Sequence, residues 1–75
     1  MKICIVGAGA IGGYLGVKLI KAGLDVSLVA RGAHLEAMKK KGLTIIENEK
    51  EIACFPKCSE NMEELGKMNL ILITL

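Results

Sequence analysis

The spacing of apolar residues changes several times along this chain, and each change marks a predicted element. Residues 2–6 form a short continuous apolar run that ends at a glycine, which is typical of a parallel strand buried on both faces. From Ala10 the apolar residues recur at helical spacing as far as Ala22, and Gly23 follows where a C-terminal cap belongs. Residues 24–30 return to an apolar, β-branched pattern. This part of the chain predicts a right-handed βαβ unit with parallel strands.

Shorter elements follow in the second half of the chain. The pattern predicts a short helix, a two-stranded hairpin, a single helical turn and a last buried parallel strand, at residues 33–41, 43–47 with 52–55, 62–65 and 69–75. Leu35 and Met38 are expected to face inward, and the polar residues 48–51 are expected to form the charged tip of the hairpin. The order of elements predicts an α/β fold of the Rossmann type, with a parallel, doubly wound sheet that is truncated after about four or five strands.

The last predicted strand reaches the final residue, Leu75. A doubly wound sheet needs further strands to cover such an edge, because an uncovered apolar edge strand invites aggregation. We therefore expect residues 1–75 to be the N-terminal portion of a larger domain. A natural chain that ended here would have to pair this edge with a second copy, as a homo-oligomer.

Charge and aromatic content argue against nucleic acid as a partner. The formal net charge of +2 is too small to favour a polyanion, and Tyr14 and Phe55 are the only aromatic residues, so the chain has no platform on which bases could stack. No stretch approaches the roughly 18 uninterrupted apolar residues of a membrane helix. Gly7 and Lys18 interrupt the apolar start before it could serve as a signal peptide. We expect a soluble protein without a membrane partner.

The three cysteines fit a reducing compartment better than a disulfide framework, which predicts a cytoplasmic protein. Cys4 lies inside an apolar run and is expected in the core. Cys54 and Cys58 are expected at a strand end and in a loop. They have no second pair and no nearby histidine, so no metal site is predicted.

A glycine-rich motif of the form G-x-G-x-x-G lies between the first strand and the first helix. In this context Gly7 permits the tight turn, Gly9 lets the backbone approach a pyrophosphate, and Gly12 lets the helix lie close to the strand. The phosphates would meet the free amides and the positive end of the helix. The residues predicted to contact the cofactor here are Gly7, Ala8, Gly9, Ala10, Ile11 and Gly12.

The alternative is a glycine-rich turn that binds no ligand. Gly12, Gly13 and Gly16 all fall within the predicted helix, where each costs about 1 kcal/mol relative to alanine. Close packing explains Gly16 without a ligand. Gly7 and Gly9 precede the helix and are best explained by a phosphate group.

The choice of cofactor depends on the end of the second strand. In proteins that bind NAD, an acidic residue about 20 positions into the unit holds the ribose hydroxyls. Here Asp25 comes too early and Glu36 too late, and Arg31 occupies the position. Arginine offers a planar fork of donors to a 2′-phosphate, which NADP carries and NAD lacks. Arg31 therefore predicts NADP; the alternative is an ordinary surface arginine.

Other charged residues are expected to face solvent. Lys39, Lys40 and Lys41 end a helix, where cations favour the helix dipole. His34 is expected at the surface next to the adenine, without a catalytic role. The glutamates of the hairpin and of the following turn are expected on the solvent side: Glu47, Glu49, Glu51, Glu60, Glu63 and Glu64.

Three stretches of the chain resemble the N-terminus of the ketopantoate reductases, also called 2-dehydropantoate 2-reductases: GAGAIGG at 7–13, VARGAHLEAMKKKGL at 29–43 and NLILITL at 69–75. The resemblance extends across the whole chain. The VARG turn with its following helix is far more specific to this family than the glycine motif alone. It implies NADPH-dependent reduction of ketopantoate to pantoate, on the route to pantothenate and coenzyme A. Other 2-keto acids stay open as substrates.

The positions carried over from this family bind cofactor and perform no catalysis. They are residues 7–12 on the pyrophosphate, Arg31 on the 2′-phosphate, and Thr74 and Leu75 near the cofactor at the strand end. The family's catalytic residues and its helical substrate domain are absent from residues 1–75, so this part alone is expected to be inactive. The alternative function is a non-catalytic NADP-binding module that senses redox state or scaffolds a partner.

Overall fold

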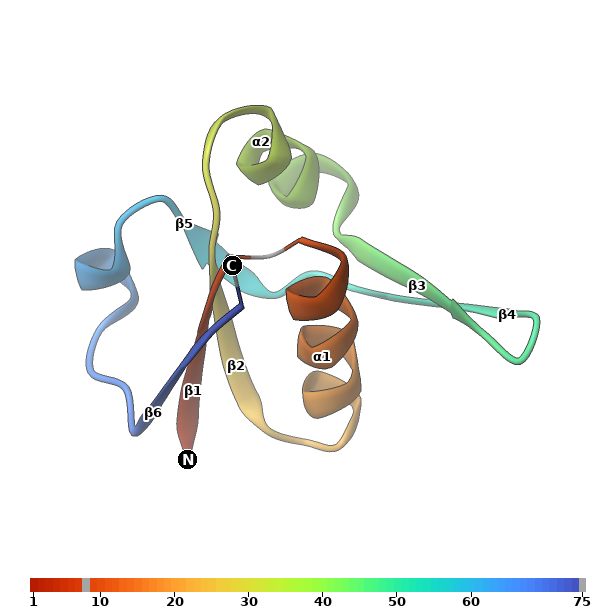
Figure 1. The fold of residues 1–75 in the computed structure, drawn as a ribbon, viewed down its shortest axis with the longest axis horizontal. Helices are drawn as coiled ribbons and strands as arrows, with labels where there is room; N and C mark the ends of the chain where they lie inside the picture. Colours follow the sequence, from red (N-terminus) through yellow and green to blue (C-terminus); the bar gives the residue numbers. More distant parts are fainter. Residues whose placement is uncertain (8, 75) are drawn as a thin grey trace.

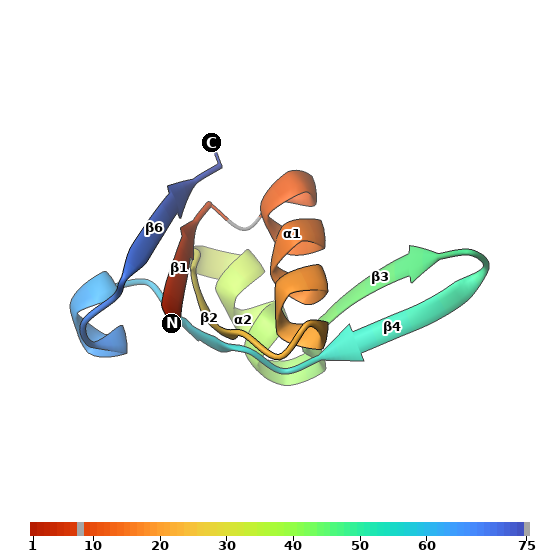
Figure 2. The ribbon, with the colours of Figure 1, turned by 90° about the horizontal axis from the view of Figure 1, so that it is seen from below.

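The computed structural model describes residues 1–7 and 9–74, and its main sheet has four parallel strands in the order β5-β2-β1-β6. The strands are β1 (Lys2–Val6), β2 (Asp25–Val29), β5 (Lys57–Ser59) and β6 (Leu70–Ile73). Helices α1 (Ala10–Lys21) and α2 (Gly32–Lys41) lie on one side of this sheet, and the 3-10 turn η1 (Met62–Leu65) lies on the other (Figures 1 and 2). The predicted Rossmann-type α/β fold is confirmed.

The register of the sheet brings the carboxyl ends of the strands to one edge. β1 pairs with β2 from Lys2 opposite Asp25 to Val6 opposite Val29, and it pairs with β6 up to Ile73 opposite Val6. Both neighbours therefore end level with β1. The chain leaves β1 for the glycine turn at this edge, and it leaves β2 for α2 at the same edge.

The hydrophobic core lies between the sheet and the two helices. Ile5, Leu28 and Val17 are fully buried, and Leu35 and Met38 of α2 are buried as predicted. Burying a side chain of this size contributes about 1.5–3 kcal/mol. The core thus fixes both helices against the strands from which they emerge. No helix within the described ranges is long and apolar enough to cross a membrane.

The predicted hairpin projects from the body of the molecule (Figures 1 and 2). It consists of β3 (Leu43–Glu47) and β4 (Lys50–Cys54), which pair antiparallel. Its turn is formed by Asn48 and Glu49 alone, with φ of 52° and 64°, as in the type I′ turns that match the twist of a hairpin. The predicted four-residue tip at 48–51 was wrong, because the ladder continues to Lys50 opposite Glu47.

Two predictions about the remaining strands were also wrong. Cys58 was expected in a loop, but it lies in β5, which is held by main-chain pairing with residues 27–29 of β2. β6 is parallel to β1 as expected, but it was predicted as a buried strand, and Ile71 and Ile73 are 47% and 67% exposed. β6 forms the edge of the sheet, which agrees with the uncovered apolar edge expected for residues 1–75. A continuous apolar run predicts a strand of a parallel sheet, but it does not show which part of the protein packs against that strand.

Candidate functional site

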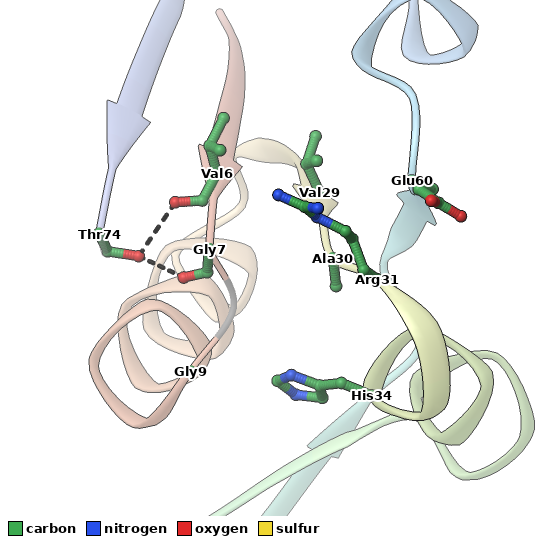
Figure 3. Close-up of a pocket in the computed structure, with 9 residues that line it drawn as sticks. All are labelled: Val6, Gly7, Gly9, Val29, Ala30, Arg31, His34, Glu60 and Thr74. Atoms are coloured by element: carbon green, nitrogen blue, oxygen red, sulfur yellow. Dashed lines mark hydrogen bonds between the residues drawn. The ribbon is translucent and has the colours of Figure 1, made fainter.

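A pocket of about 620 Å³ lies at the carboxyl ends of the four parallel strands (Figure 3). Each strand or the segment directly after it contributes to the lining, which consists of Val6, Gly7, Gly9, Val29, Ala30, Arg31, His34, Glu60 and Thr74. Open α/β sheets bind their ligands at this edge, and small-molecule sites are typically about 300–1,000 Å³ in volume. The pocket is therefore the candidate binding site.

The glycine turn leaves the start of α1 open. Gly7 has φ of +92°, a left-handed conformation that side chains disfavour. Gly9 is the N-cap of α1, no side chain caps the helix, and its first turn contains no acidic residue. A Cβ built on Gly9 would meet nothing within 4 Å. The first amides of α1 are free of a side-chain cap, and the positive end of the helix dipole suits an anion.

The close approach predicted at Gly12 is confirmed. A Cβ on Gly12 would lie 2.5 Å from Thr74 Oγ1 and closer still to the carbonyl oxygen of Gly7, so a side chain has no room there. The same packing argument was wrong for Gly16. A Cβ at that position would lie 3.5 Å from the nearest side-chain carbon of Leu28, an ordinary contact.

Two basic side chains enter the pocket from the start of α2. The guanidinium of Arg31 extends across the ends of β1 and β2, and the imidazole of His34 points toward Gly9 (Figure 3). Within residues 1–7 and 9–74 the only ion pair joins Lys18 to Glu47, so the Arg31 guanidinium has no carboxylate partner there. It is placed to meet an anion that enters from solvent.

The structure brings together some of the predicted site residues and not others. Gly7, Gly9, Arg31 and Thr74 line the pocket, whereas Ile11 is 76% exposed and does not line it. Ala10 begins α1, and Ala8 and Leu75 lie outside the described residues. Glu60 is exposed, as expected, and it also lines the pocket from the end of β5. The prediction missed this role because it had not found β5.

A second polar cluster, which we term the hairpin clamp, joins α1 to β3 through Tyr14, Lys18 and Glu47. The Tyr14 hydroxyl donates to Glu47 Oε2 at 2.6 Å, and Lys18 Nζ donates to Glu47 Oε1 at 2.8 Å. The hydrogen bonds from Lys18 and then Tyr14 hold the pKa of the Glu47 carboxyl below its ordinary value. Glu47 was expected to face solvent; it is partly exposed, but its bonds to Tyr14 and Lys18 were not foreseen.

The described side chains do not bring together a metal centre. Across residues 1–7 and 9–74, no group of three or more His, Cys, Asp and Glu side chains could hold a metal ion. Cys4 and Cys54 are free thiols, and burial raises the pKa of each.

The sheet order and the turn at its carboxyl edge define a Rossmann-like α/β domain. A family model described as ketopantoate reductase PanE/ApbA matches residues 3–75. The chain belongs to the ketopantoate reductase family, as its sequence motifs predicted.

Individual relatives agree with this assignment. The chain is 50% identical over 76 residues to the 2-dehydropantoate 2-reductase of Mesorhizobium japonicum, in a match that covers 100% of this chain and 23% of that protein. The structure of 2-dehydropantoate 2-reductase from Geobacter metallireducens superposes with a TM-score of 0.87 at 34% identity, and the match covers 100% of this chain and 25% of that one. A ternary structure of D-mandelate dehydrogenase with NADH and anilino(oxo)acetate superposes with a TM-score of 0.88 at 32% identity, covering 99% and 25% of the two chains. The chain thus spans about a quarter of the length of these proteins.

Proposed function

We propose that residues 1–75 form the cofactor-binding part of an NADPH-dependent reductase of a 2-keto acid, and that the whole protein reduces ketopantoate to pantoate. The observation that carries this proposal is the pocket at the strand ends, where the glycine turn and the Arg31 guanidinium face one cavity (Figure 3). The names of the relatives from Mesorhizobium japonicum and Geobacter metallireducens support ketopantoate as the substrate.

The glycine turn suits the pyrophosphate of a dinucleotide. Gly9 presents bare backbone with open space beside it, and α1 begins there without a side-chain cap. Backbone amides at a helix N-terminus bind phosphate without a basic side chain. Gly7 and Gly9 are therefore the residues that would hold the pyrophosphate.

Arg31 suits the 2′-phosphate that distinguishes NADPH from NADH. It follows β2 directly and lies at the N-cap of α2, with its guanidinium over the pocket. The acidic residue among those that line the pocket is Glu60, which follows β5 and not β2, where an acid would hold the ribose hydroxyls of NAD. Its carboxylate points away from Arg31 (Figure 3). The similar D-mandelate dehydrogenase structure contains NADH. Arg31, and not the fold, therefore supports NADPH as the cofactor.

When bound, NADPH would supply the hydride that reduces the keto group. The residues of this chain bind and orient the cofactor and keep its phosphates at the strand ends. The relatives are about four times as long as this chain, which leaves room for a substrate-binding part. We expect residues 1–75 alone not to reduce the substrate.

Titration of the intact protein with NADPH and NADH tests the proposal, followed by an assay of ketopantoate reduction. One charge-assisted hydrogen bond contributes about 1.5–3 kcal/mol, so NADPH is expected to bind about tenfold to a hundredfold more tightly than NADH. Equal or tighter binding of NADH would overturn the cofactor choice. Binding of neither would overturn the proposed function, and turnover of other 2-keto acids alone would overturn the substrate.

A further inference from the structure

Thr74, the residue after β6, is tied to the glycine turn by both its main chain and its side chain. Its N–H donates to the carbonyl oxygen of Val6 at 2.9 Å, which extends the pairing of β6 with β1. Its hydroxyl also approaches that oxygen, at 3.3 Å, and donates to the carbonyl oxygen of Gly7 (Figure 3). The end of β6 is therefore fastened to the first residue of the turn.

Gly7 is held from two neighbouring strands at once. Its N–H donates to the carbonyl oxygen of Val29 in β2 at 3.1 Å, while its own carbonyl oxygen accepts the Thr74 hydroxyl. A hydrogen bond to this oxygen restricts how the Gly7 carbonyl can turn. Thr74 thus restrains the backbone at Gly7, where the chain leaves β1.

Gly12 lies against the Gly7 carbonyl oxygen and the Thr74 hydroxyl oxygen. A Cβ there would collide with the Gly7 oxygen and with Thr74 Oγ1. This places β1, α1 and β6 in one junction, which we term the turn junction and define by Gly7, Gly12 and Thr74. Because the space is filled, the turn cannot relax toward α1 without moving Thr74.

The Thr74 hydroxyl has one proton to donate, and two carbonyl oxygens of the protein surround it. The predicted contact of Thr74 with the cofactor stays a prediction, but the donor of its hydroxyl is already used within the protein. We infer that Thr74 is a positioning residue: its hydroxyl holds the Gly7 carbonyl so that the backbone of the turn is oriented for the pyrophosphate before cofactor arrives. The inference rests on the proposed function, because it assigns the turn to a dinucleotide.

Two substitutions in the intact protein separate the hydroxyl from the shape of the side chain. Thr74→Val keeps the branched shape and removes the donor, whereas Thr74→Ser keeps the donor and removes a methyl group. Calorimetry measures the dissociation constants of NADPH and of 2′-AMP. The second ligand is the control, because 2′-AMP has a 2′-phosphate for Arg31 and lacks the pyrophosphate. We expect T74V to weaken NADPH binding about tenfold and to change 2′-AMP binding less than about twofold, with T74S near the unsubstituted protein for both.

A merely structural role would give a different result. An equal loss for NADPH and 2′-AMP, NADPH binding by T74V as tight as before, or T74S as weak as T74V would each overturn the inference. If T74V does not fold, as judged by its melting temperature, Thr74→Ala replaces it with the same criteria. If the unsubstituted protein binds neither NADPH nor NADH, the proposed function fails and this inference fails with it; if it binds NADPH and T74V binds equally well, only the inference fails.

Discussion

The turn junction and the hairpin clamp both fasten α1 to a neighbouring strand, but they do so by different means. The turn junction uses two glycines and one half-buried threonine, and it has no room for an added Cβ on Gly12. The clamp uses the ends of three side chains, and the side chains of Lys18 and Glu47 are 46% and 27% exposed. Close packing should make the junction insensitive to pH and salt, whereas exposed charges make the clamp depend on both.

Of the substitutions in these two regions, Gly12→Ala is expected to change the free energy of unfolding most. The added methyl has no space at the turn junction, so we expect the free energy of unfolding to fall by about 1–3 kcal/mol and NADPH affinity to fall with it. Gly16→Ala in the same helix is the matched control. Its methyl meets ordinary contacts, so stability should stay unchanged or rise by up to about 1 kcal/mol.

Urea unfolding of both variants measures this difference. A Gly12→Ala protein as stable as Gly16→Ala would contradict the account of the turn junction.

A smaller effect is expected at the hairpin clamp, and it depends on pH. The pKa of Glu47 is lowered in the folded protein, first by the hydrogen bond from Lys18 and then by that from Tyr14. The clamp therefore adds stability above the ordinary carboxyl pKa of 4.5, and this stability is lost as the pH falls through the lowered pKa. Glu47→Gln should remove this part of the pH dependence.

Urea midpoints at pH 7 and near pH 3 measure the effect, with Glu49→Gln at the exposed hairpin turn as the matched control. The difference between the unsubstituted protein and Glu47→Gln should shrink at the lower pH and in high salt. A difference that is the same at both pH values would show that Glu47 acts by packing and not by its charge.

The same contrast explains what the sequence could predict. The glycine turn could be predicted because Gly7, Gly9 and Gly12 lie close together in sequence and form a motif between a strand and a helix. The part of Thr74 in the turn junction could not be predicted, because Thr74 lies 67 residues from Gly7 along the chain. Arg31 was found because the end of β2 is a defined place in the fold. The strands β1 and β2 were found from their apolar runs.

The positions of Glu47 and Glu60 could not be predicted, because they depend on contacts with residues that are distant in sequence. Glu47 meets α1 because β3 passes beside this helix, which brings it within reach of Tyr14 and Lys18, far from it in sequence. Glu60 reaches the pocket through β5, a strand of three residues that exists because β2 offers a free edge. Tertiary pairing supplies such elements where local propensity is weak.

The most direct test of the central claim is the titration of an Arg31→Ala variant of the intact protein with NADPH and with NADH. The account predicts that NADPH binding weakens about tenfold to a hundredfold while NADH binding changes little, because only NADPH carries the phosphate that Arg31 would hold. Lys39→Ala, an exposed basic residue of the same helix outside this pocket, should leave both unchanged. Equal losses for NADPH and NADH in Arg31→Ala would contradict the account.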